Sequence, residues 1–574
     1  MKNPLVSSML RELADYTEVE DDQPYRARAY RRAAESIEAL SEDIEKIAKE
    51  GKLKDLPGIG EAIEKKILEI LRTGNLETLE KLKKKGPVDV SSLLRVEGIG
   101  PKTVKSLYRD LGIRNLDDFE SAVKEGKLST YKGLGIKGSQ QMLERIENAR
   151  QKTGRVLLVE AESIAKRVST QLSRIPGVRR HVIAGSYRRM KETIGDLDAL
   201  VESDSPDSLI AFTRGDEVRQ VLAAGETKAS VKFEKNFQVD VRVVPGESFG
   251  AALLYFTGSK SHNVELRTRA IKMGYRLNEY GLYRSDDETR VAGVTEEEVY
   301  SSLGLDYIEP ELRESKGEIE AAEKHALPKL VALKDVKGDL QMHTSWSDGA
   351  ESMDSMAEAS RRLGYEYIAL TDHVGSLKIA NPMDEKRIKE QWKEIDSINK
   401  KYDREKTNFH VLKGAEVNIK SDGTLDMPDS ILKDLDIVLA SIHSGFNDDV
   451  AKIMKRFQGA LENENVDIIA HPTGRLLLER SGYGIDLRSL ISGAIETETV
   501  LEIDGFPNRL DLSDENSFEA LRSGCMMSVD TDAHNQRELE YMKFGVAQAR
   551  RAWAESKNIL NTKSYSDLMK FLSS

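Results

Sequence analysis

Cysteine is almost absent from this chain: Cys525 is the only one among 574 residues. A single thiol excludes intrachain disulfides and argues against the disulfide-stabilised class of secreted proteins. The chain also has no apolar run long enough to cross a bilayer, and its first residues lack the charged, apolar and small-residue pattern of a signal peptide. We therefore expect a cytoplasmic protein without a membrane-spanning segment.

Histidine is also scarce, and acidic residues outnumber basic ones. The chain has only 9 histidines, and its formal net charge is −12. This acidity is uneven, because residues 1–310 sum to about zero and residues 311–574 to about −12. An acidic second half repels DNA and attracts divalent cations. The length predicts several domains, and we expect any DNA binding to be modest and sensitive to salt.

Two carboxylates, Asp196 and Asp198, stand one residue apart in GDLDAL, shortly after the Gly185-Ser186 pair of HVIAGSYRR. Alternate side chains of a strand share a face, so both carboxylates are expected to point the same way. Carboxylate oxygens bind hard divalent cations such as Mg²⁺. The backbone N–H groups of a turn after Gly185 can hold phosphate. Together these features favour metal-assisted nucleotidyl or phosphoryl transfer over a solvated pair of loop charges.

A third carboxylate, Asp240, lies in FQVDVRVV. The valines at 239, 241 and 243 alternate with polar residues, which predicts a strand with one apolar face. On a neighbouring strand, Asp240 completes a triad with the earlier pair. On its own it is an ordinary surface carboxylate.

The segments GSYRRMKETIGDLDAL, VDVRVV, LLYFTGSKSHNVELR and LNEYGL resemble, in this order, the palm and thumb of the family X DNA polymerases, over roughly residues 160–290. The resemblance implies that Asp196, Asp198 and Asp240 bind two Mg²⁺ ions, which serve the primer 3′-OH and the leaving pyrophosphate. It also implies a set of nucleotide-binding residues: Gly185, Ser186, Arg189, Tyr255, Phe256, Gly258, Asn263 and Arg267. Lys260 stands where the family often has aspartate, which leaves open how the base is contacted.

Glycine-framed turns recur three times near the start of the chain, as LPGIG (56–60), VEGIGPKTV (96–104) and KGLGIKGSQ (132–140). Glycine permits positive φ and has no side chain, so backbone amides at the following helix can reach a DNA phosphate. This pattern is the helix-hairpin-helix motif, which binds duplex DNA without reading its sequence. The candidate DNA-binding residues of the first two turns are Gly58, Gly60, Gly98, Gly100 and Lys102.

The first of these segments resembles the amino-terminal lyase domain of polymerase beta. The resemblance places Lys66 at the Schiff-base nucleophile and Arg26, Tyr30 and Lys54 at the 5′-phosphate, while Ala62 stands where the family often has lysine. A nucleophilic lysine needs a lowered pKa. Two hypotheses stay open: the segment removes 5′-deoxyribose phosphate, or it only holds the 5′-phosphate of a gap.

Beyond residue 310 a charged, helix-prone segment leads into apolar runs that mostly end in polar residues. The runs are GDLQMH, YIALTDH, HVLKGAEV, DIVLASIHS, DIIAHP, TVLEIDGF and MMSVDTDAH. They alternate with amphipathic stretches, which predicts parallel strands and a β/α barrel with its functional residues at the strand ends. Five of the 9 histidines follow these runs, so we expect a metal cluster rather than isolated core histidines.

These runs resemble the polymerase-and-histidinol-phosphatase (PHP) phosphoesterase domain. The resemblance implies up to three Mn²⁺ or Zn²⁺ ions and 3′–5′ exonuclease activity, with 3′-phosphatase or abasic-site activity as further options. The implied ligands are His343, Asp348, His373, Glu416, His443, His471, Asp532 and His534, with Glu416 bridging two ions. Gln341 stands where the family has histidine, and an amide oxygen is a weaker ligand. Asp504 either compensates or is a plain loop carboxylate.

The expected fold is therefore multidomain, with an all-α helix-hairpin-helix region, an α+β nucleotidyltransferase palm and thumb, and a distorted β/α barrel. The expected boundaries are a lyase-like domain (1–85), a fingers-type domain (86–150), the palm (151–245), the thumb (246–316), a linker (317–334) and the PHP domain (335–574).

The expected function is gap-filling DNA synthesis with 3′-end processing in DNA repair, including base excision repair. We expect a monomer that acts on gapped or nicked duplex DNA with dNTPs. Three alternatives stay open: a polymerase whose PHP domain is structural and inactive, a template-independent nucleotidyltransferase, and a DNA-end-binding scaffold without catalysis.

Overall fold

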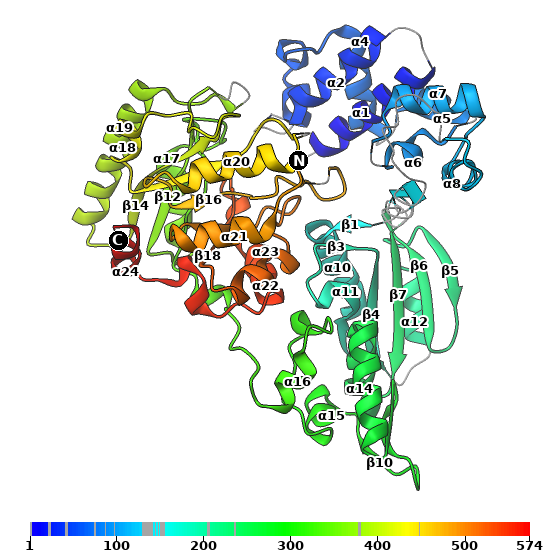
Figure 1. The fold of residues 1–574 in the computed structure, drawn as a ribbon. Helices are drawn as coiled ribbons and strands as arrows, with labels where there is room; N and C mark the ends of the chain where they lie inside the picture. The colour runs from blue at the N-terminus through cyan, green and yellow to red at the C-terminus, as the bar shows by residue number, and fades with distance from the viewer. Residues whose placement is uncertain are drawn as a thin grey trace. The chain divides into compact units, whose positions relative to one another are not determined.

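The computed structural model divides into two compact units, Met1–Gly154 and Arg155–Ser574 (Figure 1). The residues that it describes are 3–20, 24–38, 40, 44–73, 76–85, 88–96, 98–128, 142–143, 145–146, 149, 155–203, 207–234, 237–376, 380–446, 448–480 and 482–573. The third predicted glycine turn, residues 132–140, lies outside them.

The first unit is helical. Its elements are α1 (Asn3–Glu20), α2 (Pro24–Glu38), α3 (Ile44–Lys49), the 3-10 turn η1 (Leu53–Asp55), α4 (Glu61–Thr73), α5 (Glu77–Lys85), α6 (Val90–Leu94), α7 (Pro101–Leu111) and α8 (Leu116–Lys124). Helical periodicity explains the packing: in α4, Ile63, Ile67 and Ile70 fall on one face and are buried. Gly58 and Gly98 have φ of +80° and +85°, so both hairpins need glycine.

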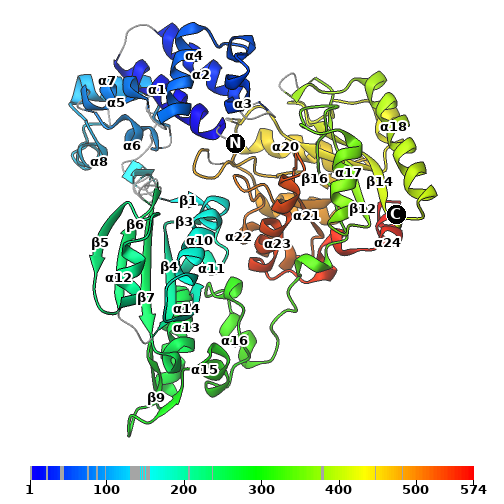
Figure 2. The same ribbon diagram turned by 180° about the vertical axis from the view of Figure 1, so that it is seen from behind.

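The second unit begins with a five-stranded palm sheet of order β2-β4-β7-β6-β5 (Figure 2). Its elements are β1 (Val156–Leu157), α10 (Leu158–Ser173), β2 (Val178–Ile183), α11 (Gly185–Arg188), β3 (Thr193–Ile194), β4 (Asp196–Ser203), α12 (Asp207–Thr213), β5 (Gln220–Ala224), β6 (Lys228–Lys232) and β7 (Gln238–Val244). The strand predicted around Asp240 is β7, but its burial does not alternate as expected: Val239, Asp240 and Val241 are all buried, and Val243 is half-buried. Strands β4 and β7 are parallel, with Asp198 opposite Asp240.

The thumb follows the palm. Its elements are η3 (Gly246–Ser248), α13 (Phe249–Thr257), α14 (Lys260–Lys272), β8 (Tyr275–Asn278), β9 (Gly281–Arg284), β10 (Arg290–Ala292), α15 (Glu296–Ser302), η4 (Pro310–Leu312) and α16 (Glu318–Glu323). The segment predicted as a linker, residues 317–334, opens with α16, whose Ile319 and Ala322 pack in the thumb core. Glu318 is fully buried there, and its Oε1 lies 2.7 Å from His262 Nδ1.

A buried ion pair also stabilises the thumb. Arg313 is fully buried and donates from Nη1 to Glu296 Oε1 at 2.6 Å. Burial alone would raise the pKa of Glu296, but Arg313 and Arg188 lower it from 4.5 to about 2. A depressed carboxyl pKa contributes stability that is present above pH 4.5 and is lost as the pH falls toward 2.

Replacing Arg313 by methionine leaves the Glu296 charge partly uncompensated. We expect this change to lower the free energy of unfolding by about 3–5 kcal/mol and to weaken its dependence on pH between 4.5 and 2. Urea unfolding at several pH values measures both effects. The exposed Arg276, paired with Glu288 at 3.2 Å, is the matched control, and Arg276→Met should change stability by less than about 1 kcal/mol. Equal losses in the two variants would contradict this account.

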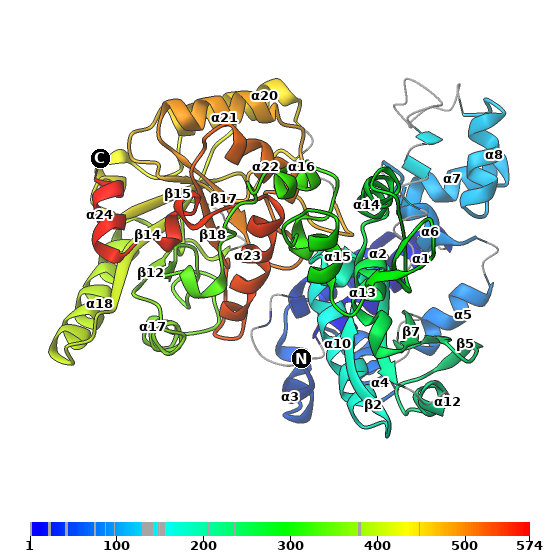
Figure 3. The ribbon, with the colours of Figure 1, turned by 90° about the horizontal axis from the view of Figure 1, so that it is seen from below.

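The rest of the chain forms a nearly closed barrel of parallel strands surrounded by helices (Figure 3). The strands are β11 (Gly338–Asp339), β12 (Tyr367–Leu370), β13 (His373–Val374), β14 (His410–Asn418), β15 (Ile437–Ser441), β16 (Ile468–Ile469), β17 (Val500–Asp504) and β18 (Met527–Asp530). A parallel bridge between Met342 and Ala533 brings the ends of the first and last strands together. The barrel prediction is confirmed, since each strand comes from one of the predicted apolar runs.

The helices and short turns of the barrel lie between and after these strands. They are η5 (Leu333–Asp335), α17 (Met353–Arg362), α18 (Glu385–Arg404), α19 (Asp429–Leu432), α20 (Val450–Leu461), α21 (Leu487–Glu496), α22 (Asp514–Arg522), η7 (Glu538–Tyr541), α23 (Met542–Arg551), η8 (Ser556–Asn558), η9 (Leu560–Thr562) and α24 (Tyr565–Leu572). Palm and barrel share apolar packing, because Leu510 and Phe544 belong to the palm core. Among the described residues, no helix is long and apolar enough to cross a membrane.

Two candidate active sites

The three palm carboxylates gather on two adjacent strands. Asp196 and Asp198 lie on β4, and Asp240 lies opposite Asp198 on β7. Burial and then the charges of Asp196 and Asp240 raise the pKa of Asp198 to about 6. Carboxylates this close repel one another, and a divalent cation between them relieves the repulsion. The donor set therefore fits a hard metal ion.

A lysine that sequence reasoning missed also belongs to this site. Lys228 Nζ on β6 lies 2.6 Å from Asp240 Oδ2. Burial would raise the pKa of Asp240, but hydrogen bonds from Lys228, Ser230 and Gln238 lower it. Lys228 was not recognisable in the sequence, because its role depends on β6 pairing antiparallel with β7.

The turn after β2 requires glycine at Gly185. Its φ is +65°, and a Cβ there would lie 2.7 Å from Asp198 Oδ2. The helix α11 that follows carries Ser186, and Arg189 caps its end. Residues predicted to bind phosphate therefore lie beside the carboxylates.

The other predicted nucleotide-binding residues cluster where α13 meets α14. The rings of Tyr255 and Phe256 pack edge to face with centroids 5.1 Å apart. Asn263 donates from Nδ2 to Tyr255 O at 2.7 Å, and Arg267 donates from Nε to Asn263 O at 3.3 Å. Gly258 completes this cluster, because a Cβ there would lie 3.2 Å from Arg189 Nη1.

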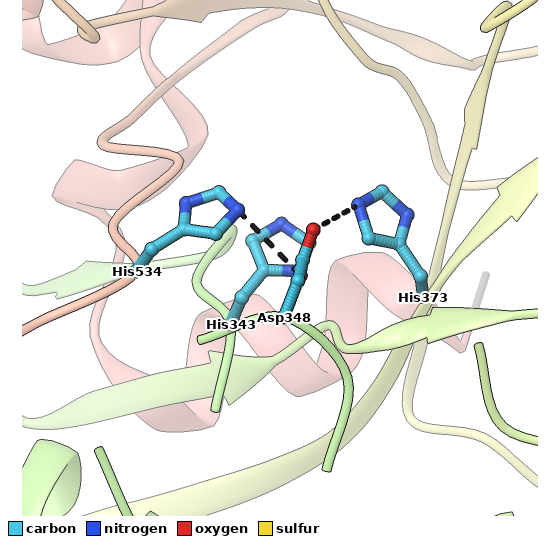
Figure 4. Close-up of side chains that lie close together, drawn as sticks. All are labelled: His343, Asp348, His373 and His534. Atoms are coloured by element: carbon cyan, nitrogen blue, oxygen red, sulfur yellow. Dashed lines mark ion pairs between the residues drawn. The ribbon is translucent and has the colours of Figure 1, made fainter. Parts of the chain in front are cut away.

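The eight predicted barrel ligands meet at the carboxyl ends of the strands. Figure 4 shows four of them, His343, Asp348, His373 and His534, whose donor atoms lie within 4.8 Å of one another. Two further groups share members with this one. The first is His373, Glu416 and His443, and the second is His343, Glu416 and Asp532. His471 joins through Nε2, 3.0 Å from Glu416 Oε1.

Glu416 is the centre of this cluster. Its Oε1 lies 3.3 Å from His443 Nε2, and its Oε2 lies 3.4 Å from His343 Nε2. Neither ring nitrogen of the buried His343, nor Nδ1 of His471, makes a well-aligned hydrogen bond to any residue that the structure describes. Unpartnered imidazole nitrogens beside carboxylates fit metal ligands, and this mixture of donors suits Zn²⁺ or Mn²⁺.

Gln341 occupies the position where the sequence departs from the PHP pattern. Its Nε2 donates to Glu416 Oε2 at 3.2 Å, while its buried Oε1 has no hydrogen-bond partner among the described residues. The amide oxygen is therefore free to act as a weak ligand. Asp504 is fully buried nearby, and its Oδ2 lies 3.4 Å from Arg509 Nε.

Two further barrel residues were missed from the sequence. Arg509 also approaches Asp532, with 3.6 Å between Nε and Oδ2, and so brings a guanidinium to the cluster. Asp372 accepts from the N–H and hydroxyl of both Thr344 and Ser347, which fixes the loop that carries Asp348. Asp372 sits in YIALTDH beside a predicted ligand, and that is the only signal the sequence offered.

In the helical unit, Lys66 Nζ lies 3.1 Å from Thr78 Oγ1. Burial lowers the pKa of Lys66, against the opposing charge of Glu69 and with a smaller contribution from Arg26. Tyr30 is buried, at 8% exposed, and Lys54 pairs with Glu64 at 3.2 Å. Gly60 precedes α4, while Gly100 caps α7, whose second residue is Lys102. This unit therefore presents two glycine turns and one lysine with a lowered pKa.

A carboxylate triad on a mixed palm sheet, joined to a barrel lined with imidazoles and carboxylates, defines a metal-dependent enzyme with two sites for phosphate chemistry. Family models match four segments: a helix-hairpin-helix domain at residues 1–76, a SAM-like helix-hairpin-helix tandem at 90–148, a DNA polymerase beta thumb at 252–314 and a PHP domain at 339–493.

Whole-chain comparisons agree with these matches. The chain is 40% identical to the DNA polymerase/3′-5′ exonuclease PolX of Bacillus subtilis (strain 168) over 570 residues, which cover 98% of each protein. It is 31% identical to DNA polymerase lambda of Arabidopsis thaliana over 50% of this chain and 58% of that protein. It is also 28% identical to DNA polymerase lambda of Rattus norvegicus, over 54% of this chain and 56% of that protein. The chain belongs to the family X DNA polymerases that carry a PHP domain, as the sequence motifs predicted.

Proposed function

We propose that the protein fills gaps in DNA during repair and processes the 3′ end with a 3′–5′ exonuclease in its barrel. The observation that carries this proposal is the full-length similarity to a polymerase/exonuclease, together with two separate carboxylate-rich sites in one chain. Its proposed substrates are gapped or nicked duplex DNA and dNTPs, bound through helix-hairpin-helix turns. The proposed working form is a monomer in the cytoplasm. Its proposed domains have the boundaries expected from the sequence.

In the palm, Asp196, Asp198 and Asp240 would hold two Mg²⁺ ions, which activate the primer hydroxyl and stabilise the leaving pyrophosphate. Ser186 and Arg189 orient the triphosphate, while Tyr255 and Phe256 lie against the sugar. Lys228 keeps Asp240 ionised and fixes the direction of its carboxylate. The gathering of all three carboxylates argues against a DNA-binding scaffold without catalysis.

In the barrel, the eight clustered ligands would hold up to three Mn²⁺ or Zn²⁺ ions, which activate water and stabilise the leaving 3′ oxygen. Glu416 would be a ligand common to two of the groups, and Asp372 holds the loop of Asp348 in place. Arg509 presents a guanidinium that can bind the scissile phosphate. The complete ligand set apart from Gln341 favours an active barrel over a structural one.

A primer-extension assay on a one-nucleotide gap tests this proposal. With the templated dNTP, Mg²⁺ and Mn²⁺, the proposal expects addition of one nucleotide that matches the template. Addition of any nucleotide regardless of the template would favour a template-independent nucleotidyltransferase. Without dNTPs, the 3′ end should shorten.

Lys66 is proposed as the nucleophile of a 5′-deoxyribose-phosphate lyase. With an incised abasic substrate, borohydride should trap the wild-type protein on DNA. Lys66→Ala should reduce trapping by at least about tenfold, because Lys66 is the proposed nucleophile and burial lowers its pKa, as a Schiff base requires. Lys65→Ala is the matched control, since Lys65 is exposed and paired with Glu61. Equal trapping by all three proteins would show that Lys66 is not the nucleophile, and 5′-phosphate binding would then be the remaining proposal for this unit.

A further inference from the structure

Arg551, the last residue of the barrel helix α23, reaches into the polymerase part of the chain. It is 2% exposed, and its Nη1 donates to the backbone oxygen of Arg189 at 2.6 Å. Its Nη2 donates to Asp514 Oδ2 at 2.5 Å, and its Nη1 also lies 3.2 Å from Glu314 Oε1. A buried guanidinium needs charge partners, and here they come from both the barrel and the end of the thumb.

The backbone oxygen that Arg551 binds belongs to the nucleotide turn. Arg189 caps helix α11: its N–H donates to the oxygens of Gly185 and Tyr187, and its own carbonyl, just beyond the helix, accepts from Arg551. At the other end of α11, Gly185 packs against Asp198. This short helix is therefore held between the catalytic carboxylates and an arginine of the barrel.

The side chain of Arg189 is held by the same network. Its Nε donates to Glu314 Oε1 at 2.9 Å, and its Nη1 donates to Thr257 O at 2.5 Å. Arg189 and Arg551 thus share one oxygen of Glu314. Through that carboxylate, Arg551 influences the position of the Arg189 side chain as well as its backbone.

We propose that Arg551 is a positioning residue for nucleotide addition: from the exonuclease barrel it fixes the turn that carries Ser186 and Arg189. This inference rests on the proposed function, which assigns these two residues to the incoming triphosphate. It makes polymerisation depend on a barrel residue that lies outside the metal cluster. Loss of Arg551 loosens the turn and weakens dNTP binding, while the barrel ligands stay in place.

Steady-state gap filling tests the inference in the full-length chain. Arg551→Met should raise the KM for the templated dNTP about tenfold, the loss associated with one charge-assisted hydrogen bond, with a smaller change in kcat. Arg551→Lys, which keeps a cation, should regain part of that loss. Shortening of the 3′ end by the same preparations should stay within about twofold of wild type.

Two controls separate positioning from general damage. Arg551→Met combined with Asp514→Asn removes the cation together with one of its carboxylates. Glu314 keeps its pair with Arg189, while Lys316 loses its partner at 3.5 Å, and thermal melting checks the fold of the variant. Lys543→Gln breaks another contact between barrel and palm, the 2.7 Å ion pair with Glu162, without touching α11. It should leave the KM unchanged.

An unchanged KM for the dNTP in Arg551→Met, alone and combined with Asp514→Asn, would overturn the inference. So would a parallel loss of extension, shortening and thermal stability, because that pattern describes a structural contact only. If the unaltered protein does not extend primers, the proposed function itself fails.

Discussion

Replacing Asp198 by alanine is expected to reduce nucleotide addition about a thousandfold or more, while DNA binding is retained. Asp198 is the middle carboxylate of the triad, with Asp196 on its own strand and Asp240 opposite it. Removing it takes away one of the three proposed metal ligands. Single-turnover extension of a gapped primer measures the loss, and a gel-shift assay measures DNA binding.

Glu202 provides the matched control for Asp198. It lies on the same strand but pairs with Arg180 at 2.5 Å, away from the triad. Glu202→Gln should therefore extend primers within about twofold of wild type. Extension that survives in Asp198→Ala would show that the triad is not the catalytic centre of the palm.

Replacing His343 by alanine is the second large expected effect, with shortening of the 3′ end reduced about a hundredfold or more. His343 is fully buried and contacts three carboxylates, Asp348, Glu416 and Asp532, at 3.7, 3.4 and 3.0 Å. Its loss removes a member of two of the three ligand groups found among the described residues. We also expect the variant to retain less Mn²⁺ or Zn²⁺ after gel filtration, as measured by elemental analysis.

His410→Ala is the matched control in the barrel. The imidazole of His410 stacks on Tyr565 with centroids 3.7 Å apart and contributes to none of the ligand groups found among the described residues. Shortening by this variant should remain within about twofold of wild type. Full activity and full metal content in His343→Ala would contradict the assignment of His343 as a metal ligand of the exonuclease site.

The main elements of both sites were predictable because their signals are local. The alternation of apolar and polar residues around Asp198 and Asp240 predicted two strands, and the structure pairs them. In the barrel, each apolar run became a parallel strand, so residues that end neighbouring runs meet at one rim. The positions of His343, His443 and His471 follow from this rule.

Partners that meet only through tertiary packing were not predictable. Lys228 reaches Asp240 because β6 pairs with β7, and the sequence KASVK does not indicate this pairing. Arg509 and Arg551 look like ordinary surface cations in the sequence, yet both are drawn inward by carboxylates from distant segments. Ile319 lies in the segment expected as a linker, 317–334, and its packing in the thumb core was likewise not predictable, because the sequence of one short helix does not show which residues it contacts.

The central claim is that one chain contains two independent active sites for DNA ends. The most direct measurement follows a 5′-labelled primer in a one-nucleotide gap, with and without dNTPs, for wild type, Asp198→Ala and His343→Ala in parallel. The account predicts that extension is lost only in Asp198→Ala and shortening only in His343→Ala. Loss of both reactions in either variant would contradict it, because it would show that the two reactions share one site or one inseparable fold.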